Sequence, residues 1–231
     1  MAALRTILYR IIFFGGSTLH VITAFLGSIF SVRLMRWTVR CWSRYQTLCA
    51  RWILGIEIKI DGHIPDKPVL FAIKHESMFE TIDMHRFFDY PAVVAKMQLA
   101  RIPFWGFAAR RYGMIFVDRD GGAQSLRKML AQAKQAIIDE RPIVIFPEGT
   151  RVDHGQRPAL QSGFAGLYKM LRLPVVPIAV DSGKCIPRGS WIFHPGIIRY
   201  QIGQEIPAGL QREEIEKRVH SAINALNSGH K

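Results

Sequence analysis

The chain has 231 residues, of which 49% are hydrophobic, and 31 Lys and Arg against 18 Asp and Glu give a formal net charge of +13. This composition is too apolar for a disordered basic tail, and the length suits one globular domain with a leader. The excess of positive charge favours anionic partners. The three cysteines, Cys41, Cys49 and Cys185, lack the paired spacing of a metal site, and we expect them to be reduced thiols that fill apolar space.

The first predicted element is an apolar segment, residues 11–32, in which His20 is the sole titratable side chain. It is long enough to cross a bilayer, which takes about 20 apolar residues. It is too long for a secretory signal peptide, and no small-residue cleavage site follows it. Arginines flank it on both sides, so the positive-inside rule assigns no orientation. A full span, a helical hairpin that dips into the bilayer and a buried core helix remain alternatives.

Residues 33–52 predict a helix that lies along a membrane surface. At about 100° per residue the arginines fall within a narrow arc, while apolar and aromatic residues spread over the opposite side. Arginines suit lipid phosphates, and tryptophans suit the headgroup level. A solvated basic face on a core helix and a nucleic-acid surface are the alternatives, but the neighbouring apolar segment favours the membrane. The arginines of the arc are Arg33, Arg36, Arg40, Arg44 and Arg51.

After Gly55, short apolar runs alternate with helical stretches, a pattern typical of an α/β domain. Several runs are apolar throughout, which predicts a mostly parallel central sheet covered by helices on both faces. We therefore expect a membrane-associated helical leader over residues 1–54 and an α/β domain over residues 55–231. The predicted strands are residues 56–60, 69–73, 92–95, 114–117, 143–146, 175–180 and 197–202, and the predicted helices are residues 79–88, 123–139 and 163–171.

The stretch KHESMFETID, residues 74–83, follows a predicted strand and has two interpretations. Ser77 and Glu80 fit the S-x-x-E capping box of a helix start. On one continuous helix, positions five apart point roughly 140° away from each other, so His75 and Glu80 can meet only if His75 precedes the helix. A helix capped by Ser77 has that arrangement, and Glu80 can then both cap the helix and pair with His75.

A second polar group follows the strand predicted at residues 143–146. The sequence FPEGTR offers Glu148, a glycine that allows close backbone approach, a hydroxyl and the planar fork of Arg151, which suits phosphate oxygens. Arg119 and Lys96 also stand just past predicted strands. Because ligands bind beyond the carboxyl ends of parallel strands, these side chains predict an anion site. The alternative is an ordinary turn with surface ion pairs.

Four blocks in this order and spacing, KHESMFE, GMIFVDR, FPEGTR and VVPIAV, resemble those of the 1-acyl-glycerol-3-phosphate acyltransferases. In the H-x-x-x-x-D block of that family the histidine is the base and the acid orients it, which implies these catalytic roles for His75 and Glu80. Glu80 replaces the usual aspartate, and KHES replaces N-H-Q-S, so Lys74 and Glu76 add charges beside the base. The second and third blocks hold the glycerol phosphate, which implies a substrate site formed by Arg119, Glu148, Gly149, Thr150 and Arg151, with Lys96 as an addition.

The resemblance also implies the reaction. We expect a fatty acyl group to move from acyl-CoA or acyl-carrier protein to the 2-hydroxyl of lysophosphatidic acid, giving phosphatidic acid at the cytoplasmic face of the cell membrane. No metal ion, other cofactor or nucleic acid is expected. The alternatives are an acyltransferase for another lysolipid, such as a lyso-ornithine lipid or lysophospholipid, and a non-catalytic membrane protein that binds anionic lipids.

Overall fold

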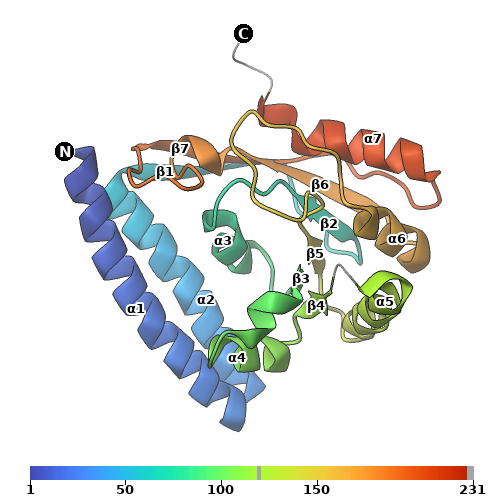
Figure 1. Ribbon diagram of the computed structural model, residues 1–231, viewed down its shortest axis with the longest axis horizontal. Helices are drawn as coiled ribbons and strands as arrows, with labels where there is room; N and C mark the ends of the chain where they lie inside the picture. The colour runs from blue at the N-terminus through green and yellow to red at the C-terminus, as the bar shows by residue number, and fades with distance from the viewer. Residues whose placement is uncertain (119–120, 228–231) are drawn as a thin grey trace.

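A seven-stranded sheet forms the centre of the computed structural model, which describes residues 1–118 and 121–227 (Figure 1). The strand order is β1-β7-β6-β2-β5-β3-β4, and neighbouring strands are parallel except for β6 and β7. The predicted α/β fold with a mostly parallel sheet is confirmed. The strands are β1 (Ile56–Asp61), β2 (Leu70–Ile73), β3 (Ala92–Lys96), β4 (Ile115–Val117), β5 (Ile143–Ile145), β6 (Val175–Val180) and β7 (Gly196–Ile202).

Helices flank the sheet, and some of them were not predicted. The predicted ones are α3 (Phe79–Phe87), α5 (Gly122–Ile138) and α6 (Ser162–Leu171). The structure adds α4 (Trp105–Tyr112) and α7 (Arg212–Ile223). Short turns of 3-10 helix are η2 (Met97–Arg101), η4 (Ser182–Lys184) and η5 (Ala225–Asn227).

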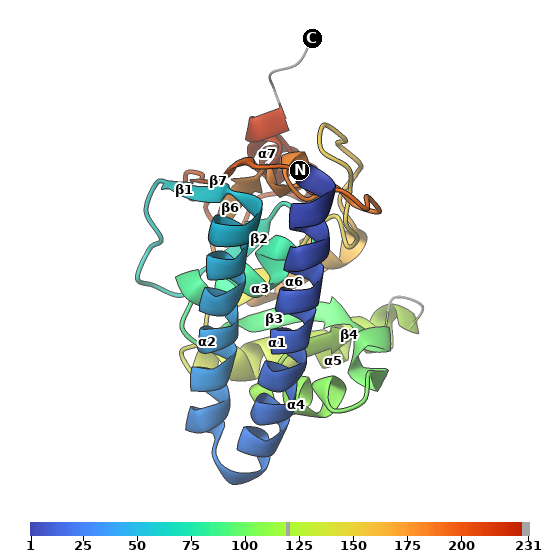
Figure 2. The same ribbon diagram turned by 90° about the vertical axis from the view of Figure 1, so that its left-hand side faces the viewer.

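The N-terminal segment folds into a hairpin of two helices, α1 (Ala2–Phe30) and α2 (Val32–Cys49), which turns at Ser31. Figure 2 shows the two helices side by side along their length. Gly16 permits this approach, because a Cβ atom there would lie 2.3 Å from Tyr45 Oη. A π-helical turn, η1 (Ala50–Leu54), then leads through Gly55 into β1.

Alternating side chains of the central strands enter two apolar cores. In β2, Phe71 and Ile73 belong to the core shared with α1, α2 and α3, whereas Leu70 and Ala72 belong to the core under α5, α6 and α7. Each of these side chains is at most 2% exposed. A strand buried on both faces has a continuous apolar sequence because neither face meets water.

The surface of the hairpin is apolar on α1, whereas α2 exposes arginines together with apolar side chains such as Trp37 and Leu48. Among the described residues, α1 is the one helix whose length and composition would let it cross a membrane. Large apolar side chains such as Leu4 and Ile11, 72% and 68% exposed, cover its outward face. On α2, Arg36 and Arg40 pair with Asp89 of the α/β domain, the former at 3.0 Å. The residues that α2 buries are Met35, Thr38, Ser43, Gln46 and Cys49.

Candidate active site

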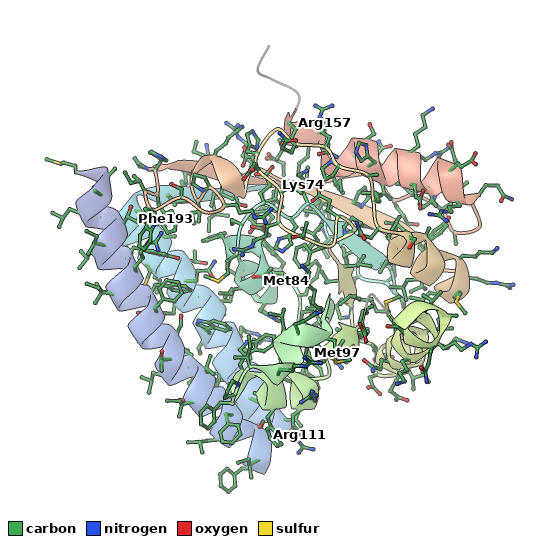
Figure 3. The ribbon with its side chains drawn as sticks, viewed as in Figure 1. Lys74, Met84, Met97, Arg111, Arg157 and Phe193 are labelled. Atoms are coloured by element: carbon green, nitrogen blue, oxygen red, sulfur yellow. The ribbon has the colours of Figure 1, made fainter. Side chains whose placement is uncertain are left out.

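The predicted polar blocks meet at one edge of the sheet. Because β2 lies parallel to both β5 and β6, the carboxyl ends of these strands coincide. His75 follows β2, residues 148–151, which we call the EGTR segment, follow β5, and Ser182 follows β6. Figure 3 labels Lys74, which immediately precedes the histidine, in the interior of the domain at this edge.

His75 and Glu80 form a hydrogen-bonded pair. The Nδ1 atom of His75 lies 2.9 Å from Glu80 Oε1, and the two side chains are 14% and 0% exposed. His75 precedes α3, which begins at Phe79, so the backbone can bring the two side chains together. Asp83, the next acid on α3, instead binds Arg86 at 3.0 Å. Glu80 is therefore the acid that contacts the imidazole.

Both carboxylate oxygens of Glu80 accept hydrogen bonds. In addition to the imidazole, Oε1 accepts the backbone N–H groups of Glu76 and Ser77 at 2.7 Å each. Oε2 accepts the hydroxyls of Ser77 and Ser182 at 2.8 and 2.7 Å. Burial opposes ionisation, but the hydrogen bonds from His75 and Ser182 outweigh it and hold the pKa of Glu80 below its ordinary value. An ionised Glu80 keeps the proton of His75 on Nδ1 and leaves the lone pair of Nε2 available.

Glu80 caps α3 as well as binding the imidazole. Its Oε1 atom accepts the N–H of Ser77, while the Ser77 hydroxyl oxygen accepts the N–H of Phe79 at 3.0 Å. The N-cap residue is Met78, so Ser77 lies one residue further from the helix than the capping box predicts. The two interpretations of KHESMFETID thus hold in one arrangement of side chains.

Lys74, which precedes His75 in the chain, is buried and has three acceptors. Lys74 Nζ donates to Glu148 Oε1 at 2.6 Å, to Asn224 Oδ1 at 2.8 Å and to the carbonyl of Gln156 at 2.8 Å. Glu148 Oε2 accepts the backbone N–H of His75 at 3.0 Å, and the His75 carbonyl accepts a backbone N–H from the same loop at 2.8 Å. The loop after β5 therefore holds the backbone of His75 from both sides.

Glu76, which follows His75 in the chain, pairs with His154 of the loop after β5. Its Oε1 atom lies 3.0 Å from His154 Nδ1, and its Oε2 atom accepts the N–H of Gly183 at 2.9 Å. Burial raises the pKa of Glu76 from its ordinary 4.5 to about 8 despite the Gly183 hydrogen bond, and the charge of Glu80 acts in the same direction as burial. Glu76 therefore keeps its proton at neutral pH and adds little negative charge beside His75.

A cavity of about 2210 Å³ borders His75. The α1–α2 hairpin supplies one wall through side chains such as Phe13 and Trp42, and α4 supplies further apolar surface through Trp105. The same cavity reaches Arg151 of the EGTR segment. The imidazole of His75 thus borders a cavity that has both apolar walls and a cation.

The predicted substrate residues divide into three groups. Those that line the cavity are Lys96, Gly149, Thr150 and Arg151. Glu148 is 2% exposed, and both of its carboxylate oxygens are bound within the protein. Arg119 lies outside the described residues. Within residues 1–118 and 121–227, no group of three or more His, Cys, Asp or Glu side chains could hold a metal ion.

Three residues of this site were not identified from the sequence. Ser182 stands at the carboxyl end of a predicted strand, so the strand-end rule that located the other polar groups also applies to it. His154 and Asn224 reach their partners from a loop and from the end of α7. No local sequence pattern marks these two contacts.

Comparisons with known proteins agree with this architecture. A family model described as Acyltransferase matches residues 55–181. The 1-acyl-sn-glycerol-3-phosphate acyltransferase of Pseudomonas aeruginosa is 30% identical over 210 residues, 89% of this chain and 82% of that protein. The protein of the same name from Saccharomyces cerevisiae is 26% identical over 186 residues, 78% and 60% of the two chains. The crystal structure of the 1-acyl-sn-glycerophosphate acyltransferase of Thermotoga maritima, 19% identical, has a similar fold, with a TM-score of 0.77 over 100% of both chains.

Proposed function

This chain belongs to the acyltransferase family, and from that premise we propose that it transfers a fatty acyl group from a thioester to the 2-hydroxyl of 1-acyl-glycerol-3-phosphate, giving phosphatidic acid. One observation carries the proposal: His75, which is paired with Glu80, borders a large and mostly apolar cavity that Arg151 also lines. This arrangement supplies a base, a space for acyl chains and a cation for a phosphate. The names of the relatives support the same acceptor.

His75 acts as the general base of the proposed reaction. Its Nε2 atom takes the proton of the acceptor hydroxyl as that oxygen attacks the thioester carbonyl. The tetrahedral intermediate then breaks its carbon–sulfur bond, and the thiolate takes the proton back from the imidazolium. The buried carboxylate of Glu80 stabilises the imidazolium in between. General-base help of this kind increases a rate by roughly 10²–10⁴-fold.

The acceptor phosphate binds at the polar end of the cavity. Arg151 offers a planar fork, Thr150 a hydroxyl, and Lys96 a further positive charge at the end of β3. Glu148 serves the site indirectly, because it holds Lys74 and the backbone of His75. At about 2210 Å³, the cavity exceeds the roughly 300–1,000 Å³ of common small-molecule sites, which suits long acyl chains.

Residues 1–54 form the membrane-associated leader, and residues 55–231 form the catalytic domain. The exposed apolar face of α1 supports membrane association, and a donor such as acyl-CoA or acyl-carrier protein places the reaction at the cytoplasmic face of the cell membrane. The hairpin contributes a wall of the cavity, so a lipid acceptor can reach His75 from the bilayer.

A panel of acceptors and donors tests this function. The full chain, purified in detergent, is assayed with lysophosphatidic acid, lysophosphatidylglycerol and lyso-ornithine lipid, each with acyl-CoA and with acyl-carrier protein. We expect the highest kcat/KM with lysophosphatidic acid. A higher kcat/KM with another lysolipid would identify that lysolipid as the acceptor instead. The absence of transfer to every acceptor would favour a non-catalytic lipid-binding protein.

A further inference from the structure

The segment between η4 and β7, residues 185–195, lies against the N-terminal helix as well as the candidate active site. Arg10 on α1 donates to the carbonyl of Ser190 at 2.9 Å, and the backbone N–H of Phe193 donates to the Thr6 hydroxyl at 2.9 Å. Figure 3 labels Phe193 beside α1. These contacts fix the segment between the hairpin and the sheet edge.

From this segment Arg188 reaches the EGTR segment. Its Nη1 atom donates to the backbone carbonyl of Arg151 at 2.6 Å, and both arginines line the cavity that His75 borders. In the part of the chain that the structure describes, neither guanidinium pairs with a carboxylate. Both side chains are exposed to solvent, and two guanidinium groups on one cavity wall can bind the oxygens of an anionic ligand that enters the cavity.

We propose that Arg188 binds the acceptor phosphate together with Arg151 and makes the site selective for a phosphomonoester. This inference rests on the proposed function. A phosphomonoester has three free oxygens and carries about 1.5 to 2 negative charges at pH 7, whereas a diester headgroup phosphate has two free oxygens and one charge. One guanidinium fork satisfies a diester. The second guanidinium can form a charge-assisted hydrogen bond only with the additional free oxygen of a monoester. Arg188 therefore adds more binding free energy for lysophosphatidic acid than for a diester lysolipid.

Kinetics on matched acceptors test the proposal. Lysophosphatidic acid and lysophosphatidylglycerol with the same acyl chain are compared in the parent and in Arg188→Ala. Loss of a charge-assisted contact should raise KM and Kd for lysophosphatidic acid roughly ten- to hundredfold. The same constants for lysophosphatidylglycerol should rise less than about threefold. The KM of the thioester donor should not change.

Two further variants separate binding from support of the loop. Arg188→Gln keeps an N–H donor on a shorter side chain but has no charge, so it should lose the preference for the monoester as Arg188→Ala does. Arg199→Ala removes an exposed cation of β7 outside the cavity and should leave both acceptors unchanged. Thermal unfolding verifies that each variant folds.

The outcomes that overturn the proposal are distinct. An equal rise of KM for both acceptors that Arg188→Gln rescues would show that Arg188 only supports the loop. An unchanged Kd for lysophosphatidic acid in Arg188→Ala would show that Arg188 does not bind the phosphate. If the parent binds lysophosphatidic acid through Arg188 but transfers no acyl group, the proposed function fails while this inference stands.

Discussion

At the scale of single residues, Glu80 holds the imidazole of His75, the base of the proposed reaction, through a hydrogen bond of 2.9 Å. From the first turn of α3 its carboxylate meets the imidazole, two backbone N–H groups and the hydroxyls of Ser77 and Ser182. A buried carboxylate with this many donors stays ionised and is fixed in orientation. The position of the His75 proton therefore depends on Glu80.

Glu80→Gln removes the charge and keeps the shape. The Gln carbonyl at the Oε1 position still accepts the backbone N–H groups, and the hydroxyls of Ser77 and Ser182 can rotate to accept from the amide. The imidazolium loses a charge-assisted hydrogen bond worth about 1.5–3 kcal/mol, so kcat should fall roughly 10–150-fold with little change in thermal stability. Glu80→Asp keeps the charge and should retain more activity. Parental turnover in Glu80→Gln would leave Glu80 as a helix cap alone.

Lys74 and Glu148 form a buried ion pair in which each charge is compensated by the other. Lys74→Met would leave the Glu148 carboxylate in the interior without a counter-charge, which costs about 3–5 kcal/mol in the free energy of unfolding. The double variant Lys74→Met, Glu148→Gln removes both charges and should be more stable than the single variant. Denaturant unfolding measures both. A double variant no more stable than the single one would contradict this account of the pair.

Glu76 makes stability depend on pH. Between about pH 4.5 and pH 8 the folded chain keeps a proton on Glu76 that the unfolded chain releases, because burial raises the pKa of Glu76 to about 8. The free energy of unfolding should therefore fall as pH rises through this window, by up to about 1.4 kcal/mol per pH unit. Glu76→Gln cannot titrate, so its advantage over the parent should grow from near zero at pH 4.5 to its largest value at pH 8. An equal pH dependence in both proteins would exclude Glu76 as the cause.

At the scale of elements, the close approach of α1 and α2 depends on Gly16. The ring of Tyr45 lies over Gly16, stacks on Phe13 and His20, and donates its hydroxyl to the carbonyl of Ile12. Any side chain at Gly16 would displace this ring. The packing of the hairpin also shapes the cavity, because both helices line it.

Adjacent glycines provide a matched test of this packing. Ala at Gly15 meets nothing within 4 Å, so Gly15→Ala should stabilise the helix by up to about 1 kcal/mol. Ala at Gly16 would place Cβ 2.3 Å from Tyr45 Oη, and overpacking of this kind costs about 1–3 kcal/mol. The midpoint temperature of thermal unfolding should therefore rise for Gly15→Ala and fall for Gly16→Ala. A shift in the same direction would show that the hairpin adapts without cost.

The strands could be predicted because burial on both faces leaves a continuous apolar sequence, as in β2 and β6. The short helix α4 was missed because its sequence contains Gly106 and follows Pro103. In α7, the buried residues Ile215, Val219 and Ile223 repeat at helical spacing, so the sequence does contain a signal for this helix. Elements in which buried apolar residues recur at a regular spacing can thus be predicted from the sequence.

In the candidate site too, local contacts could be predicted from the sequence and long-range contacts could not. The contact between His75 and Glu80 could be inferred because the two residues are five apart and a helix start lies between them. The hydrogen bond from Lys74 to Asn224 joins residues 150 positions apart, and it depends on the packing of α7 against β6 and β2. Contacts that depend on tertiary packing leave no local pattern.

At the scale of the whole molecule, the leader is part of the folded protein. Tyr9, Phe13 and Cys49 of the hairpin belong to the same apolar core as Phe71 of β2. The hairpin also lines the cavity that borders His75. A bilayer beside the hairpin would therefore lie next to a wall of the cavity that His75 borders.

The most direct test of this account compares acyl transfer and acceptor binding in His75→Ala and the parent. With labelled acyl donor and lysophosphatidic acid, the parent should form labelled phosphatidic acid, and His75→Ala should form it roughly 10²–10⁴-fold more slowly. The Kd for lysophosphatidic acid should change by less than about threefold, because the phosphate contacts lie on other residues. Transfer near the parental rate in His75→Ala, or a loss of binding large enough to explain the slower rate, would contradict the role of His75 as the base.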